Sequence, residues 1–129
     1  MKNFRDLQIW SRSHQLTLEV YRLTQEFPKS ETYGLVSQMR RSVSSIPTNI
    51  AEGSGRNTEK DFARFLDNAM GSASELEYQL ILARDLEYIF HNTYEATNGE
   101  LTEIKRMLNA FIQKLRATDK PAKTQPTES

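Results

Sequence analysis

The fold is decided by residues 58–89, TEKDFARFLDNAMGSASELEYQLILARDLEYI, the longest periodic stretch of the chain. Apolar and small residues recur there in alternating steps of four and three, which is the heptad spacing of packed helices; they are Phe62, Leu66, Ala69, Ala73, Leu76, Leu80 and Ala83. Thr58 and Asp61 have the spacing of a capping box with the shorter acid in the third position. The stretch therefore predicts a helix from Thr58 to about Ile89 with one buried face.

A preceding helix is predicted from Ser30 to about Glu52. Ser30 offers an N-cap hydroxyl, and Glu31 places an acid in the first turn. Apolar residues then follow at steps of three or four; they are Leu35, Met39, Val43, Ile46 and Ile50. We continue the helix through Pro47 and end it at residues 53–55, Gly-Ser-Gly, because glycine tolerates the positive φ of many helix ends.

Two outer helices are predicted at residues 6–26 and about 94–117. The first has two apolar stripes, which indicates two buried faces; they are Leu7, Trp10, His14 and Tyr21, and Ile9, Leu16, Val20 and Leu23. Asp6 stands where an N-cap or a first-turn acid would favour the helix dipole. The last helix has Asn92 or Thr93 as its cap, and its apolar face is Leu101, Ile104, Leu108, Phe111 and Leu115.

Four helices with short connections predict an all-α protein, an antiparallel up-down-up-down four-helix bundle. Residues 1–117 are expected to form it as one domain, since a chain of 129 residues fits one hydrophobic core. Residues 118–129 have no bulky apolar side chain and two prolines. They are predicted to form a disordered C-terminal tail, because they cannot bury enough surface to offset the entropy of ordering.

The composition excludes several kinds of protein. Seventeen Lys and Arg balance seventeen Asp and Glu, so any nucleic-acid binding must come from a local patch. The absence of cysteine excludes disulfides, zinc-thiolate sites and thiol nucleophiles. Charges at Lys2, Arg5 and Asp6 argue against a signal peptide, and no run of about 18 apolar residues could span a membrane. We expect a soluble, cytoplasmic protein without a membrane partner.

The residues with catalytic or metal-binding chemistry form no recognisable site. His14 and His91 belong to no His-x-x-x-His or Glu-x-x-His pair, so neither a metal nor another cofactor is expected. Residues 52–56, EGSGR, look like a phosphate-binding loop but lack the preceding strand and the following Gly-Lys-Ser/Thr. Glu75 and Glu77 are two residues apart and cannot share one helix face. We therefore expect no catalytic residues and no enzymatic activity.

A polar stripe runs beside the apolar face of the helix at 30–52. Its members follow one another at steps of three or four, with Asn49 next to them; they are Gln38, Arg41, Ser45, Thr48 and Glu52. Spacing leaves two interpretations open. The stripe is either a solvated face or a buried or inter-subunit network in which Arg41 meets a carboxylate such as Glu75.

Basic side chains gather near both ends of the chain; they are Lys2, Arg5, Arg12, Arg22, Lys105, Arg106, Lys114 and Arg116. If the first and last helices are neighbours, these residues could form one patch that binds phosphates of RNA or DNA in a salt-sensitive way. Glu19, Glu100 and Glu103 interrupt the group. The alternative is an ordinary charged surface.

Residues 33–53 carry a run of short motifs, YGL at 33–35, QMRRS at 38–42 and SIPTNIAEG at 45–53. Supporting motifs are residues 7–10, Phe27-Pro28 and SELEYQL at 74–80. Over about residues 4–90 the chain resembles a bacterial family, the four-helix bundle proteins encoded in intervening sequences of 23S ribosomal RNA genes.

This resemblance implies a bundle that assembles with copies of itself into a ring-shaped homopentamer. It also implies a relation in fold to the accessory variability protein of diversity-generating retroelements, which binds nucleic acid through a basic surface and partners a reverse transcriptase. The resemblance singles out five polar positions with a structural or interface role, Arg40, Arg41, Asn49, Glu52 and Glu75.

Two functions remain side by side. The leading hypothesis is a non-enzymatic, homo-oligomeric scaffold that contacts RNA or DNA through the basic residues of its first and last helices. The alternative is a protein-protein interaction module without nucleic-acid binding, whose acidic third helix and polar stripe serve a protein partner such as a reverse transcriptase.

Overall fold

The computed structural model describes residues 3–119, with side chains as far as Ala117. Four α-helices dominate this part of the chain, which contains no strand. The four helices are α1 (Gln8–Thr24), α2 (Leu35–Ser54), α3 (Glu59–Asp85) and α4 (His91–Asp119). Two short 3-10 helices, η1 (Phe4–Asp6) and η2 (Lys29–Glu31), precede α1 and α2.

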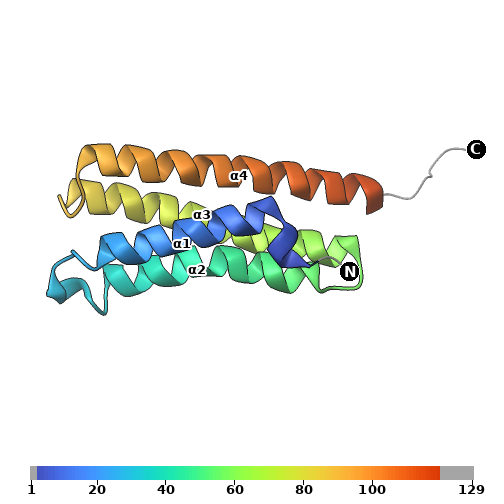
Figure 1. Cartoon of the computed structure of the whole chain (residues 1–129), viewed down its shortest axis with the longest axis horizontal. Helices are drawn as coiled ribbons and strands as arrows, with labels where there is room; N and C mark the ends of the chain where they lie inside the picture. Colours follow the sequence, from blue (N-terminus) through green and yellow to red (C-terminus); the bar gives the residue numbers. More distant parts are fainter. Residues whose placement is uncertain (1–2, 120–129) are drawn as a thin grey trace, which may run out of the picture.

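The helices run antiparallel, each returning alongside the one before it (Figure 1). α2 packs between α1 and α3, α3 packs on α4, and α4 also meets α1, so the four helices close into a bundle. The predicted all-α, up-down-up-down fold is confirmed. α4 includes Thr118 and Asp119, which the sequence assigns to the tail, and the rest of the predicted tail, residues 120–129, lies outside the described residues.

The predicted seam of α3 lies at the centre of the core. Six of its seven side chains have no exposed surface, and Phe62 is 6% exposed. The other helices close around it with apolar side chains; these include Leu16, Val20, Met39, Val43, Ile46, Ile50, Leu101, Ile104 and Leu108. The stripe of Ile9, Leu16 and Val20 is buried, whereas the stripe of Leu7, Trp10, His14 and Tyr21 is only half covered, with Tyr21 40% exposed. Within one chain α1 therefore buries one face, and the second buried face that we predicted is wrong.

The starts of the first three helices differ in how well the sequence predicts them: that of α3 is confirmed, and those of α1 and α2 are wrong. The Thr58 hydroxyl oxygen accepts from the amide of Asp61 at 3.0 Å, which confirms the predicted cap of α3. Asp6 lies in η1, and α1 begins after Leu7 without a side-chain cap. Ser30 lies in η2, so α2 begins later than expected, at Leu35.

The connection between α3 and α4 is tighter than the sequence suggests. α3 ends at Asp85 rather than near Ile89, because Glu87 adopts a positive φ of 64°. The amide of Tyr88 then donates to the carbonyl of Ala83 at 2.9 Å, which closes the helix as a Schellman motif. α4 starts directly afterwards at His91, so both predicted caps lie inside its first turn.

Pro47 creates a contact between α1 and α2. It lies inside α2 and has no amide to donate to the carbonyl of Val43, four residues earlier. The Thr17 hydroxyl of α1 donates to that carbonyl at 3.2 Å and to the carbonyl of Ser13 at 2.8 Å. Because a hydroxyl has one proton, Thr17 shares it between two acceptors. The carbonyl that Pro47 leaves free is thus satisfied by the neighbouring helix.

Gly53 is needed for close packing rather than for a turn. It lies inside α2, and no glycine among the described residues has positive φ, which corrects the role we expected for residues 53–55. A Cβ at this position would lie 2.7 Å from Cδ1 of Phe62 and 2.8 Å from Cβ of Phe65. The end of α2 can therefore meet the start of α3 only through a residue without a side chain.

We predict that Gly53→Ala lowers the free energy of unfolding by about 1–3 kcal/mol, because the two phenylalanines must shift to admit the methyl group. Gly71→Ala is the matched control, since an added Cβ there meets nothing within 4 Å and alanine favours a helix by about 0.5–1 kcal/mol. Urea denaturation of both variants measures the difference. Equal stabilities would contradict the close-packing role.

We also predict that Thr17→Val costs about 1–2 kcal/mol, because it leaves the buried carbonyl of Val43 without a donor. Thr48→Val is the control: the exposed Thr48 hydroxyl donates to the carbonyl of Ser44 within its own helix at 2.8 Å. Thermal denaturation should show a clearly larger loss for the first variant. The same loss in both would mean that the bond between the helices contributes nothing.

Candidate functional site

Polar side chains of α2 and α3 form one outer face of the bundle. The hydroxyl of Ser72 donates to Oγ of Ser45 at 2.8 Å, and Ser42 donates to Oε1 of Glu75 at 3.4 Å. These two contacts fix the register in which the antiparallel helices lie. We call the surface beside them the outer face and define it by Gln38, Arg41, Ser45, Thr48 and Glu52 of α2 and Ser72 and Glu75 of α3.

Arg41, Glu52 and Glu75 are exposed on the outer face. Within residues 3–117 Arg41 and Glu52 make no ion pair, and the expected pairing of Arg41 with Glu75 is not formed in the single chain. The pairing of Arg41 with Glu75 within one bundle is therefore wrong, although Ser45 and Glu75 accept hydrogen bonds between α2 and α3. The inter-subunit network stays a prediction.

Arg40 and Asn49, the other two of the five polar positions that the resemblance singles out, have partners within the chain. Arg40 reaches α1, where its Nε donates to Oγ1 of Thr24 at 2.9 Å and its guanidinium lies over the ring of Tyr21, 4.5 Å from the centroid. Asn49 donates to the carbonyl and the hydroxyl oxygen of Ser45 at 2.8 and 3.0 Å. Arg40 thus links α2 to α1, whereas Asn49 bonds within α2, and the structural or interface role that the resemblance implies stays a prediction.

Gln79 is a residue of interest that the sequence interpretation missed. It lies on α3 one turn beyond Glu75 and is 7% exposed, and its Oε1 has no donor within the described residues. A buried amide oxygen without a partner costs free energy. A glutamine one turn beyond Glu75 on α3 was the signal available in the sequence.

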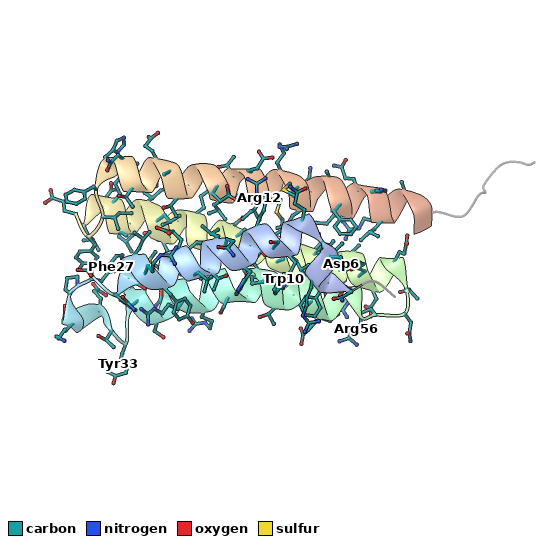
Figure 2. All side chains as sticks on the ribbon, viewed as in Figure 1. Asp6, Trp10, Arg12, Phe27, Tyr33 and Arg56 are labelled. Carbon is teal, nitrogen blue, oxygen red and sulfur yellow. The ribbon has the colours of Figure 1, made fainter. Side chains whose placement is uncertain are left out.

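Most of the basic residues that we considered for nucleic-acid binding are paired with acids. α1 and α4 are neighbours, as that patch requires. Arg12 lies on α1 beside α4 (Figure 2) and makes a two-pronged pair with Glu100 of α4 at 2.9 and 2.8 Å. Four further pairs cancel charge in the same way; they are Arg22 with Glu19, Lys105 with Glu77, Arg106 with Glu103 and Arg116 with Asp67. The structure thus brings many of these cations to neighbouring helices but neutralises most of them.

Pairing with an opposite charge shifts the pKa values of three of these groups toward their charged forms. The hydrogen bond to Glu100 raises the pKa of Arg12, and the hydrogen bond to Glu103 raises that of Arg106. Arg106 in turn lowers the pKa of Glu103. Of the three remaining cations, Lys2 lies outside the described residues, Arg5 lies over the ring of Phe4, and Lys114 has an interaction partner and lines the groove described next.

A groove of about 530 Å³ opens where α1 is shorter than α4. α1 has 17 residues and α4 has 29, so the last turns of α4 extend past the start of α1 (Figure 1). The groove is lined by apolar side chains and by polar ones that include Arg106, Lys114 and Glu59. The apolar ones are Leu7, Ile9, Met107, Ala110, Phe111 and Leu115.

The histidines have ordinary structural contacts. His14 stacks on Trp10 with ring centroids 5.1 Å apart, and His91 lies 3.2 Å from Glu95. Within the part of the chain that the structure describes, no three His, Asp or Glu side chains are grouped so that they could hold a metal ion. No helix in that part is long and apolar enough to cross a membrane.

Glu31 links the two connections at one end of the bundle. Its Oε1 accepts from the amide of Leu35 at 3.1 Å, at the start of α2, and its Oε2 accepts from the hydroxyl of Tyr88 at 2.9 Å. The ring of Tyr88 also packs on Phe27, with centroids 5.2 Å apart. The hydrogen bond to Glu31 raises the pKa of Tyr88, because a phenolate would face a carboxylate.

The fold and these surfaces define a class of protein, an all-α up-down bundle with mostly paired surface charge and one polar outer face. A family model of the 23S rRNA-intervening sequence protein matches residues 5–110. The chain belongs to this family, which confirms the resemblance seen in its motifs.

One solved structure is similar over 81% of this chain and 95% of its own length, with a TM-score of 0.76 and 29% identity. It is a protein of unknown function from the S23 ribosomal protein family of Bacteroides thetaiotaomicron VPI-5482. No curated protein matches the chain. The relation to the accessory variability protein stays a prediction.

The hydrogen bond between Tyr88 and Glu31 predicts that the stability of the fold depends on pH in the alkaline range. A pKa that is raised in the folded protein means that Tyr88 stabilises the fold below its ordinary pKa of 10.0, and that this stabilisation is lost as the pH rises through the higher, folded value. The melting temperature of the native protein should therefore fall more steeply above about pH 10 than that of Tyr88→Phe. Tyr33→Phe, at a side chain 96% exposed, is the control for removal of a tyrosine hydroxyl. Parallel profiles for Tyr88→Phe and the native protein would contradict the link.

Proposed function

We propose that the chain is a non-enzymatic scaffold that assembles with copies of itself through the outer face of α2 and α3. The observation that carries this proposal is that Arg41 and Glu52 are exposed and have no ion-pair partner among residues 3–117, whereas most basic side chains on α1 and α4 are paired within the chain. Opposite charges on one face are self-complementary, because a second copy can supply each with its partner.

Two further observations support assembly of the chain with copies of itself. The first is the amide oxygen of Gln79, one turn from Glu75 on α3, which is buried without a donor among the described residues; the side chain would have to turn outward to meet a donor of a second copy. The second is the stripe of Leu7, Trp10, His14 and Tyr21 on α1, which is half covered in the single chain, as expected of a surface that is buried further on association. The resemblance implies five copies in a ring, which needs a second contact surface besides the outer face, and this stripe offers one.

Binding of RNA or DNA through the basic residues of α1 and α4 is the less supported proposal. Phosphate binding draws its affinity from cations that can neutralise phosphates. Five of the seven candidates within residues 3–117 already form ion pairs with acids; they are Arg12, Arg22, Lys105, Arg106 and Arg116. The pairing therefore favours the alternative function, in which the partners of the scaffold are proteins.

The assembly is tested with Arg41→Ala. Removing one partner of a buried pair between subunits should weaken association by about 2–5 kcal/mol, which appears as dissociation toward the 14.9 kDa chain in sedimentation velocity. Arg64→Ala is the control, because Arg64 is also exposed and pairs with Asp61 in its own helix.

A charge exchange sharpens this test. If Arg41 of one copy meets Glu75 of another, Arg41→Glu should dissociate the assembly and the double variant Arg41→Glu/Glu75→Arg should restore it. Unchanged mass and melting temperature in Arg41→Ala would refute the role of the outer face.

A further inference from the structure

One end of the bundle exposes large apolar side chains. Tyr33 is 96% exposed, Phe90 is 81% exposed and Leu86 is 45% exposed. They come from the connection between α1 and α2 and the connection between α3 and α4, which lie at the same end of the bundle (Figure 1). Figure 2 shows Tyr33 projecting away from the helices. We call Tyr33, Leu86, Glu87 and Phe90 the aromatic end.

The backbone under the aromatic end is held in place. The hydroxyl of Tyr88 donates to Glu31 across the two connections, and its ring packs on Phe27. Tyr88 thus holds the connection between α3 and α4 against the connection between α1 and α2. A surface that is already ordered loses little conformational entropy when it binds a partner.

The aromatic end is also acidic. Residues 25–34 and 84–95 carry five carboxylates against two cations, Lys29 and Arg84, with the histidine neutral. Arg84 is already paired with Asp85. Glu87 makes no ion pair within residues 3–117, and it occupies the left-handed position of the Schellman motif, which glycine adopts more easily. The connection that carries Phe90 thus presents a carboxylate where a glycine would be less strained.

The other rings of the chain indicate what the exposed ones can bind. Guanidinium groups lie over several of them, 4.5 Å from the centroid for Arg40 on Tyr21, 4.6 Å for Arg56 on Phe65 and 4.5 Å for Arg84 on Tyr94. Within the described residues no cation covers Tyr33 or Phe90. An aromatic face beside carboxylates attracts cations, and arginine above all.

From this charge and ring chemistry we propose that the aromatic end is a docking surface for an arginine-rich segment of another protein. Guanidinium groups stack on Tyr33 and Phe90 and pair with Glu87, and their aliphatic stems cover Leu86. The excess of carboxylates repels phosphates, so nucleic acid does not fit this surface. The proposal goes beyond self-assembly, because the aromatic end is separate from the outer face of α2 and α3.

The test measures the binding of a short fluorescent peptide of alternating arginine and leucine by anisotropy, with the full chain at low salt. Tyr33→Ala/Phe90→Ala should weaken binding about tenfold, and Glu87→Gln should weaken it by a smaller factor. Tyr78→Ala is the matched control, because that ring is 62% exposed on α3 outside this end. The same peptide with lysine in place of arginine should bind more weakly to the native chain.

Three results would overturn the proposal. The first is equal peptide binding by the double variant and the native chain, or an equal loss in Tyr78→Ala. The second is a change in oligomer mass in the double variant, which would mean that a second copy covers the aromatic end. The third is binding of a labelled RNA duplex that the double variant abolishes. The oligomer mass of Arg41→Ala is independent of all three, so self-assembly and docking can fail separately.

Discussion

The close approach of α2 to α3 is the constraint on which the rest of the structure depends. The seam of α3 is buried along its length, and the alanines within it leave room for the neighbouring helix. Gly53 and the pair of serines at 45 and 72 keep the two helices near each other at their other points of contact. With small residues filling the space between the helices, the longer polar side chains of α2 point outward. The polar outer face is thus a consequence of how tightly the core is packed.

The surface regions of the molecule differ in how much unpaired charge they can offer to a binding partner. On α1 and α4 most cations meet an acid of the same chain, so little charge is left for a partner. On the outer face Arg41 and Glu52 stay unpaired within the described residues, and at the aromatic end negative charge is in excess beside uncovered rings. The two proposals, self-assembly through one surface and docking of another protein on a second, rest on this division.

The sequence predicts the bundle well because its heptad seam, its cap at Thr58 and its helix through Pro47 depend on local spacing. The starts of α1 and α2 were misplaced because Asp6 and Ser30 look like caps but lie in 3-10 turns, and the cap of α2 comes from Glu31. Spacing alone could not tell whether Arg41 is buried, since that depends on which direction a helix face points in the bundle. Pairs such as Arg12 with Glu100 join residues 88 positions apart, and no local pattern indicates them.

That same separation has a consequence for how the bundle opens. α2 with α3 and α3 with α4 are hairpins whose contacts are close in sequence, whereas α1 meets α4 only after a large loop is closed, and loop closure becomes more costly with length. α1 is also the shortest of the four helices, with 17 residues. It is therefore the element expected to detach first in local unfolding, and its amides should exchange with solvent faster than those of the α3 seam. Trp10, the only tryptophan in the chain, lies on this helix and stacks on His14, so its fluorescence reports the detachment directly.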